Sequence, residues 1–360
     1  MRLGIVGAGL SGLVVARTAA SWVDSVTVFE ASNRAGGQLY SEHAQGFVVE
    51  HGAEGFVAGS VVVPQLAEAL GIAAELQDQR VNLSYGFDGS VLSPLAAGEA
   101  ARFLGFQVKS DELGRGVRTF RSGMDQLTRA LVANLSPRVG LNLEKRVSEL
   151  TQHDEHSVLT LADGTRADFD AVVLATNAAT ASALLTPGFG DAARALSESQ
   201  TLSSVTVSLA FSESALEQPT DASGFVVAVS AQRDGLRAAS FSSSKFAERA
   251  PPRHTLVRLF FRPEAHELES LSDAEWSERA RRGLERILPV HAAPLATWVS
   301  RWDRALPVSN PAHLDRVKRL EAALAGQNIW LAGSAFHGSG IDAAVRSANG
   351  TAEALRAAFA

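Results

Sequence analysis

Residues 3–12, Leu3-Gly4-Ile5-Val6-Gly7-Ala8-Gly9-Leu10-Ser11-Gly12, decide the fold of this chain. The first four are a short apolar run of the kind that forms a buried parallel strand, and a G-x-G-x-x-G motif follows at once. A helix of small residues is expected over 13–21 and a second apolar strand over 26–29. The order strand, glycine turn, helix, strand predicts a β-α-β unit.

The three glycines of the turn have separate physical tasks in such a unit. Gly7 permits the tight turn, Gly9 lets the backbone approach a pyrophosphate, and Gly12 lets the helix pack closely on the sheet. Leu10 and Ser11, also expected to contact the cofactor, belong to the turn just before the expected helix, whose N-terminus presents free N–H groups and a positive dipole end that favour phosphate. The motif therefore predicts a Rossmann-like dinucleotide site.

Glu30 ends the second strand, eighteen residues after the last glycine of the turn. A carboxylate in this place can accept hydrogen bonds from both ribose hydroxyls of an adenosine, which fits NAD or FAD and not NADP. A glycine turn without a ligand is the structural alternative. The turn alone does not separate NAD from FAD, and an NAD-dependent dehydrogenase stays open at this point.

The residues that follow Glu30 separate the two cofactors. Ala31-Ser32-Asn33-Arg34-Ala35-Gly36-Gly37-Gln38 resembles the E-A-x-x-R-x-G-G-[RQ] signature of the flavin-containing amine oxidase superfamily. The resemblance implies FAD, with Arg34, Gly36 and Gly37 against the pyrophosphate and the flavin. It also implies that Ala31 and Gln38 contact the cofactor.

Further matches to this superfamily lie along the chain. Lys145-Arg146-Val147 resembles the family segment whose valine backbone contacts adenine, and Ala175-Thr176-Asn177 resembles its A-T-P or A-T-G strand end. Residues 331–344 resemble the second FAD motif, whose glycines and helix N-terminus would face the ribityl chain and the flavin carbonyls. From these segments the resemblance adds to the cofactor-binding set Val147, Ala175, Thr176, Gly333, Ser334, Gly340, Ile341 and Ala344.

Within the superfamily the chain most resembles the oxygen-dependent protoporphyrinogen and coproporphyrinogen oxidases. Residues 50–56, E-H-G-A-E-G-F, are similar to the family's E-x-G-P-x-S-F, and residues 120–127 are similar to its L-x-G-G-M-x-x-L. Residues 301–307, R-W-D-R-A-L-P, followed by His313-Leu314, match a third family motif. The first of these stretches adds Gly52 and Ala53 to the expected cofactor contacts.

The chain departs from those oxidases between Pro94 and Phe120. There the family carries a long helical insert that docks on the membrane and covers the substrate, whereas about two dozen residues remain here, with one helix expected over 98–106. Val308-Ser309 also stand where the family has Q-Y. Renalase-like flavoproteins, which are similarly short and oxidise reduced nicotinamide isomers, are a second comparison.

The resemblance implies an α/β flavoprotein of the para-hydroxybenzoate-hydroxylase-like type with two domains. A Rossmann-like FAD-binding domain is expected from residues 1–60, 138–178 and 325–360. A substrate domain with a mixed sheet is expected from residues 61–137 and 179–324. The active site should lie between the domains over the flavin ring, a common position for cofactor sites.

Four residues are candidates for the chemistry over the flavin. His51 and Glu54 lie in the segment expected beside the isoalloxazine, where either can act as a general base or simply hold the loop. His337, in the second flavin motif, is a candidate to face the substrate, and Trp302 is a candidate wall of the cavity or a core residue. Monoamine and polyamine oxidases place a lysine near flavin N5, and the corresponding position here is expected at Val207.

The composition of the chain excludes several kinds of partner and site. The 360 residues are 46% hydrophobic and 20% charged, with a formal net charge of −6, which argues against nucleic acid as a partner. Cys is absent, so thiolate metal sites and a thioether-linked flavin are excluded, and the histidines show no metal-binding spacing. The most apolar stretch, 171–185, is interrupted by polar residues. We expect a soluble cytoplasmic protein without a metal or a membrane span.

These features predict an FAD-dependent oxidase of protoporphyrinogen-oxidase-like type, which would pass a hydride from a small organic substrate to flavin N5 and electrons to O2. Arg80, Arg258 and Arg262 are candidates to bind a substrate carboxylate. The alternatives are an amine or amino-acid oxidase, a renalase-like dihydronicotinamide oxidase, and a flavin-binding partner protein without turnover. The sequence does not predict the oligomeric state.

Overall fold

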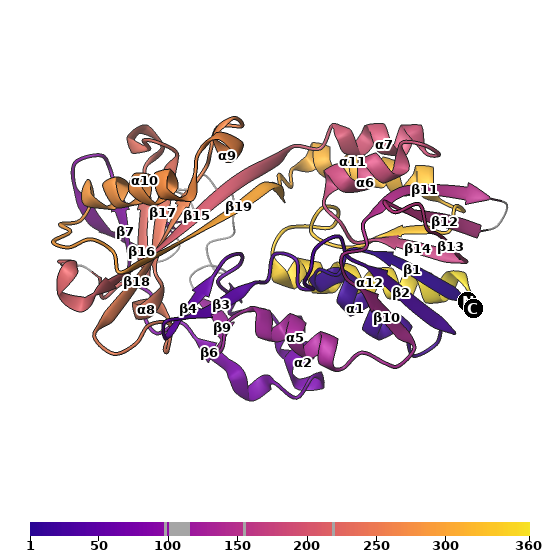
Figure 1. Cartoon of the computed structure of the whole chain (residues 1–360), viewed down its shortest axis with the longest axis horizontal. Coiled ribbons are helices and arrows are strands. Elements are labelled where there is room, and N and C mark those ends of the chain that lie inside the picture. The colour runs from indigo at the N-terminus through magenta and orange to yellow at the C-terminus, as the bar shows by residue number, and fades with distance from the viewer. Residues whose placement is uncertain (97–98, 101–115, 154–155, 218–219) are drawn as a thin grey trace.

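The computed structural model describes residues 1–96, 99–100, 116–153, 156–217 and 220–360. Within these ranges the chain forms two parts that lie side by side, one around a five-stranded sheet near both termini and one around a seven-stranded sheet (Figure 1). The helix expected over 98–106 falls almost wholly outside the described residues, as does most of the shortened segment between Pro94 and Phe120.

The five-stranded sheet is parallel throughout. β14 is buried along its whole length and β1 in all but its first residue, because other elements cover both faces of the sheet. The predicted Rossmann-like α/β fold is therefore confirmed. In the order β10-β2-β1-β14-β20, the strands are β10 (Val139–Asn142), β2 (Ser25–Phe29), β1 (Arg2–Val6), β14 (Ala171–Leu174) and β20 (Ile329–Leu331).

Two hydrophobic clusters attach this sheet to its covering layers. On one face Leu3 and Ile5 pack with α1 (Leu10–Ala19) and α12 (Ile341–Ala358), which contact each other. On the other face Val6 and Leu174 pack against a small sheet and three helices. This second layer consists of β11 (Val147–His153), β12 (His156–Leu161), β13 (Arg166–Phe169), α6 (Ala178–Leu185), α7 (Gly190–Ser197) and α11 (Pro311–Leu324).

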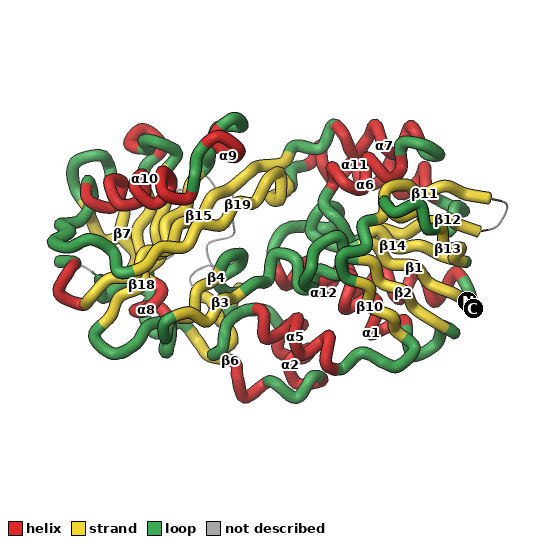
Figure 2. Tube along the Cα trace, viewed as in Figure 1, coloured by secondary structure: helices red, strands yellow, loops and turns green. Residues whose placement is uncertain are grey.

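The seven-stranded sheet is mixed, as predicted for the second domain. Its pairs are antiparallel except for β16 with β7, which is parallel. Figure 2 shows these strands in yellow. α10 (Asp273–Glu285) covers one face and starts at a capping box between Ser272 and Glu275. In spatial order the strands are β19 (Ala296–Pro307), β15 (Thr201–Ser212), β18 (His254–Phe261), β17 (Leu236–Phe241), β16 (Gly224–Val227), β7 (Ser84–Phe87) and β8 (Leu92–Leu95).

Short elements join the two sheets. The hairpin of β3 (Ser41–Ala44) and β4 (Phe47–Glu50) lies between them in Figure 1. A three-stranded sheet follows, formed by β5 (Phe56–Val57), β9 (Val117–Phe120) and β6 (Leu76–Asp78). The other elements are α2 (Val62–Ala69), α5 (Asp125–Ala133), α8 (Ser242–Lys245), α9 (Glu267–Ser270) and the 3-10 turns η1 (Ala73–Glu75), η2 (Glu213–Ala215) and η3 (Val229–Ala231).

The division into two domains remains a proposal at its boundaries. All five parallel strands fall within 1–60, 138–178 and 325–360. However, α7, α11 and most of α6 pack on the five-stranded sheet, although their residues belong to the range 179–324 expected for the substrate domain. Helical segments that cross from one part to the other carry no local signal of the sheet they will cover.

Trp276 supplies a test of the core under the seven-stranded sheet. Its side chain is fully buried on α10, and its ring meets Phe261 edge-on at 5.5 Å between centroids. We expect Trp276→Ala to lower the free energy of unfolding by about 3–5 kcal/mol, because the cavity left behind cannot close. Chemical denaturation measures this loss. Leu314→Ala, at an exposed position, should change the value by less than about 0.5 kcal/mol, and an equal loss in both variants would contradict the assignment.

Candidate functional site

A cavity of about 530 Å³ opens at the carboxyl ends of β1 and β14. Every cofactor-binding residue predicted from the sequence lines it except Gly12 and Gly52, which lie directly behind the lining. Of the four candidate catalytic residues, Trp302 lines this cavity, whereas His51, Glu54 and His337 do not. The cavity lies where open α/β sheets bind their ligands, outside the carboxyl ends of the strands.

Two glycine segments form the floor of the cavity by packing backbone against backbone. A Cβ atom on Gly37 would lie 3.1 Å from the Gly9 Cα, and the Gly36 N–H donates to the Ala8 carbonyl at 2.8 Å. A Cβ atom on Gly12 would lie 2.0 Å from the Gly7 carbonyl oxygen, which excludes any side chain there. The result is a smooth cradle bordered by backbone, as a pyrophosphate requires.

Two helix N-termini border the same cavity. α1 begins at Leu10, three residues earlier than expected, so its first free N–H groups belong to the glycine motif itself. α12 begins at Ile341 after Gly340, which has a positive φ of 91°. Ser11 joins the two helices through its hydroxyl, which donates to the Ala344 carbonyl at 3.2 Å. Together the two N-termini present an environment that favours the negative charge of a dinucleotide.

Glu30 connects the glycine turn to the next segment. One carboxylate oxygen accepts the Ala8 N–H at 2.9 Å, and the other accepts the Ser32 N–H at 2.9 Å and the Ser32 hydroxyl at 2.7 Å. A carboxylate offers about four lone-pair sites, so it retains capacity for a ribose hydroxyl. The donor set, the cradle and the two N-termini fit an adenosine-containing dinucleotide.

The sequence did not single out several residues that also line the cavity. Asp303, Arg304 and Ala305 come from β19 of the seven-stranded sheet, which therefore reaches the cavity, and the Gln38 amide donates to the Ala305 carbonyl at 3.0 Å. These three lie inside the stretch 301–307 that resembled the porphyrinogen oxidases. That motif was the available signal, although it did not indicate which of its residues face the cavity.

His51 is held at both ring nitrogens. Nδ1 lies 2.7 Å from the Ser300 hydroxyl and Nε2 lies 2.9 Å from Glu42, while the ring stacks on Tyr40 with 4.5 Å between centroids. Burial lowers the pKa of His51, against the hydrogen bond and charge of Glu42, which raise it. Its backbone carbonyl accepts the Trp302 indole N–H at 2.7 Å, so His51 fixes the ring that walls the cavity.

Glu54 is surrounded by donors from β17 and α8. Its carboxylate accepts the hydroxyls of Ser240 and Ser242 at 2.9 and 2.7 Å and lies 3.0 Å from the Lys245 ammonium. Burial alone would raise the pKa of Glu54, but Lys245, Arg258 and the hydrogen bonds outweigh it and lower the pKa to about 2. A carboxylate this acidic is a weak base near neutral pH, so the geometry favours a role in holding the loop.

Arg258, on β18 of the seven-stranded sheet, binds the backbone of the segment that carries His51. It is 2% exposed, and its Nη2 donates to the carbonyls of His51 and Gly52 at 3.2 and 2.5 Å. The same Nη2 lies 3.4 Å from the hydroxyl of Thr206, which itself donates to the His51 carbonyl at 3.4 Å. Val207, expected at the lysine position of the amine oxidases, is instead buried in the core beneath α10, because alternate residues of a strand face opposite sides.

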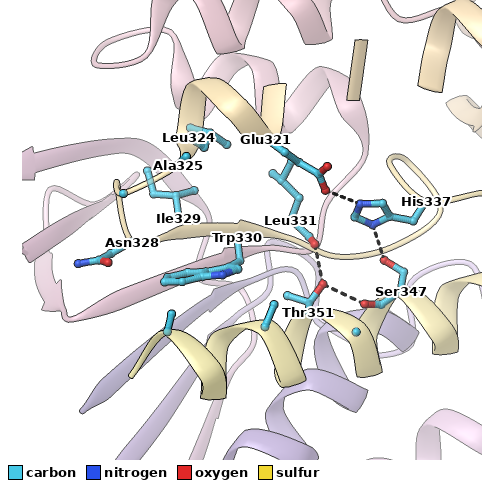
Figure 3. A pocket seen from close by; sticks show the side chains of 14 residues that line it. Glu321, Leu324, Ala325, Asn328, Ile329, Trp330, Leu331, His337, Ser347 and Thr351 are labelled. Carbon is cyan, nitrogen blue, oxygen red and sulfur yellow. Dashed lines mark hydrogen bonds and ion pairs between the residues drawn. The ribbon is translucent and has the colours of Figure 1, made fainter. Parts of the chain in front are cut away.

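His337 lies in a different cavity. Its ring contacts Ser347 and Glu321 in a separate pocket between α11, β20 and α12 (Figure 3). The loop that carries it, 332–340, borders both cavities, with Gly333 in the first. A motif can predict that a loop lies beside the flavin site, but it does not predict toward which side of the loop each side chain points.

Other kinds of site are not found in the described ranges. No group of three or more His, Asp or Glu side chains there is placed to hold a metal ion. Nor does any helix in this part of the chain combine the length and the apolar character needed to cross a membrane.

Comparison with protein families identifies the chain. Residues 5–70 match the NAD(P)-binding Rossmann-like domain, and residues 78–356 match the family described as flavin-containing amine oxidoreductase. The chain belongs to the flavin-containing amine oxidoreductase family. Its members are oxidoreductases that use a flavin, which agrees with the cavity at the glycine turn.

Named relatives narrow the comparison. The chain is 36% identical over 247 residues to the coproporphyrinogen III oxidase of Propionibacterium freudenreichii subsp. freudenreichii, covering 68% of this chain and 46% of that protein. It is 25% identical over 201 residues to the coproporphyrinogen III oxidase of Bacillus subtilis (strain 168), covering 54% of this chain and 42% of that one. The chain thus matches slightly less than half the length of these two relatives.

Solved structures share the fold. A protein from Exiguobacterium sp. 255-15, described as a candidate protoporphyrinogen oxidase, superimposes with a TM-score of 0.84 at 22% identity over 99% of both chains. Cyclohexylamine oxidase from Brevibacterium oxydans IH-35A superimposes with a TM-score of 0.76 at 13% identity, also over 99% of both chains. At these identities the likeness concerns the fold alone.

Glu30→Gln tests the ribose site. The amide keeps the size of the side chain but replaces one of its two acceptor oxygens with an NH2 donor, which must face either the Ala8 donor or the Ser32 donors. We expect the dissociation constant for FAD, titrated into the apoprotein, to rise about 10- to 100-fold, the equivalent of losing one charged hydrogen bond. Glu68→Gln, on an exposed position of α2, is the matched control. Equal affinity in both variants would remove Glu30 from the site.

Glu54→Gln tests the buried ion pair through its pH dependence. We expect the variant to unfold with about 3–5 kcal/mol less free energy at pH 7, because Lys245 loses its buried partner. The pKa of Glu54 is lowered from 4.5 to about 2, so its stabilisation is present above 4.5 and is lost as the pH falls toward 2. Urea unfolding at pH 7 and pH 3 should show the difference between wild type and variant shrinking in acid. A difference that stays constant would contradict this reading, and exposed Glu353→Gln serves as the control.

Proposed function

We propose that the protein is an FAD-dependent oxidase that dehydrogenates a porphyrinogen and uses O2 as electron acceptor. The observation that carries this proposal is the 36% identity over 247 residues to a coproporphyrinogen III oxidase, beside a cavity whose lining fits a dinucleotide. Because the match covers 46% of that relative's length, the identity of the substrate belongs to the proposal.

In this proposal the cavity holds FAD from one end to the other. Glu30 and Val147 would bind the adenosine, and the N-terminus of α1 at Gly9 would face the pyrophosphate. The turn at Gly333 and the N-terminus of α12 would face the ribityl chain and the flavin ring. FAD is favoured over NAD because residues 31–38 and 331–344, which resemble motifs of the flavin family, border the cavity beside the dinucleotide turn.

The bound flavin would supply hydride acceptance from a substrate carbon and electron transfer to O2, so that each turnover removes two hydrogens and yields H2O2. The chain's own contribution would be orientation and exclusion of water. Trp302 would wall the cavity, fixed by its hydrogen bond to the His51 carbonyl. We assign His51 and Glu54 to positioning this segment, because every polar atom of both side chains already has a partner.

Anaerobic reduction of the purified holoprotein tests the proposal. We expect coproporphyrinogen III or protoporphyrinogen IX to bleach the visible flavin absorbance, and air to restore it with formation of H2O2. The matching porphyrin, which has no hydrogens to give, is the control and should leave the colour unchanged. A panel of amines, amino acids and dihydronicotinamides is run beside them.

The outcomes separate the alternatives. Bleaching by an amine or a dihydronicotinamide, with none by porphyrinogens, would replace the proposed substrate with an amine-oxidase or renalase-like one. Colour that persists with every compound would favour a flavin-binding partner protein without turnover. A colourless protein that takes up no FAD would contradict the flavin site itself.

A further inference from the structure

A second cavity, of about 610 Å³, lies on the far side of the loop that borders the flavin cavity. α11 and α12 form its two sides and the edge strand β20 its base, as Figure 3 shows. Glu321 comes from α11, His337 from the loop 332–340, and Ser347 from α12. These three side chains meet at one end of the cavity.

A continuous chain of hydrogen bonds runs through them. Glu321 lies 2.7 Å from His337 Nε2, Ser347 Oγ lies 2.8 Å from His337 Nδ1, and the Gly333 N–H donates to the same Oγ at 2.9 Å. A carboxylate only accepts, so Nε2 carries the ring hydrogen and Nδ1 accepts from the serine hydroxyl. All bonds of the chain then point the same way, from the backbone of Gly333 to Glu321.

The inner end of this chain is a turn that borders the flavin cavity. Gly333 has a φ of 115°, and a Cβ atom there would lie 3.1 Å from Ser11 Oγ at the N-terminus of α1. Its carbonyl accepts the N–H groups of Phe336 and His337, both at 3.1 Å, which closes the turn. Ser347 Oγ is the acceptor of the Gly333 N–H, so this hydrogen bond sets the orientation of the peptide group.

The outer end is accessible. The side chains of His337 and Glu321 are 34% and 47% exposed, whereas Ser347 is buried at 8%. The same three residue types form nucleophilic triads elsewhere, but here Ser347 lies in the middle of α12 with the Gly333 N–H already on its Oγ. The N–H groups that would form an oxyanion hole are engaged in the helix, so the arrangement suits positioning and not acyl transfer.

We propose that Glu321, His337 and Ser347 are positioning residues that hold the Gly333 turn in its flavin-binding conformation and so determine how tightly the flavin is retained. This inference rests on the FAD site of the proposed function. It assigns His337 a role behind the cofactor, where it acts through Ser347 and Gly333 and touches no substrate.

The test compares flavin retention in matched variants. For Ser347→Ala and His337→Ala we expect the FAD dissociation constant to rise about tenfold or more, because the Gly333 N–H loses its partner or that partner loses its orientation. Thr351→Val is the control: it removes a hydroxyl one turn further along α12 in the same cavity. That hydroxyl bonds the carbonyls of Leu331 and Ser347, and neither Gly333 nor the Ser347 side chain. The FAD affinity of Thr351→Val should stay at the wild-type value.

Rescue separates a hydrogen-bond chain from simple packing. His337→Gln can accept from Ser347 and donate to Glu321, so we expect it to recover most of the affinity that His337→Ala loses. Imidazole added to His337→Ala has room to enter the adjoining cavity and should slow the release of FAD in that variant alone. The visible circular dichroism of the bound flavin reports whether its environment returns with the affinity.

Three outcomes would overturn the inference. Wild-type affinity in both alanine variants would show that the chain does not hold the turn. Equal losses in Thr351→Val, or no rescue by either glutamine or imidazole, would assign the effect to packing. Wild-type protein that takes up no FAD would contradict the proposed function and this inference with it, whereas the first two outcomes in a flavin-loaded wild type contradict this inference alone.

Discussion

The close approach of two glycine segments is the constraint on which the site depends. Gly9 and Gly37 lie so near each other that a Cβ on the latter would sit 3.1 Å from the former's Cα, and Gly12 has no room for a Cβ beneath the turn. Since no side chains intervene, the backbone N–H groups at the start of α1 border the cavity directly. Glu30 then holds the turn from one side, and Ser11 joins it to α12.

Buried charged groups fix the backbone where the two sheets meet. Burial raises the pKa of Glu50 to about 7 despite Arg249, Ser41 and the Met124 N–H, whereas Glu54, equally buried, has its pKa lowered to about 2 by Lys245 and its other donors. The difference lies in how well the surrounding charges and donors offset desolvation. These carboxylates flank His51, so the segment beside the proposed flavin site is fixed at both ends by groups with little freedom to move.

Prediction from sequence succeeded where spacing along the chain carries the information. The strand, turn and helix at residues 2–19 follow from local pattern, and so does the lining of the cavity by Gly7. Arg34 and Gly333, which the family resemblance placed at the cofactor, line the same cavity. It was less informative for side chains whose direction depends on register. Val207 and Thr206 differ by one position and face opposite sides of β15, and only strand pairing decides which of them meets His51.

The sequence by itself determined the parallel α/β core and the glycine turn, because glycine spacing, apolar runs and the acid at Glu30 are local requirements of that fold. It also indicated the flavin family through the resemblance of residues 31–38 and 331–344 to that family's motifs, and the family match agrees. The tertiary structure alone decided that α11 covers the first sheet and that His337 turns away from the flavin cavity toward Glu321. The reason is physical: a side chain's partners come from segments distant along the chain, and their positions are set only when the layers pack.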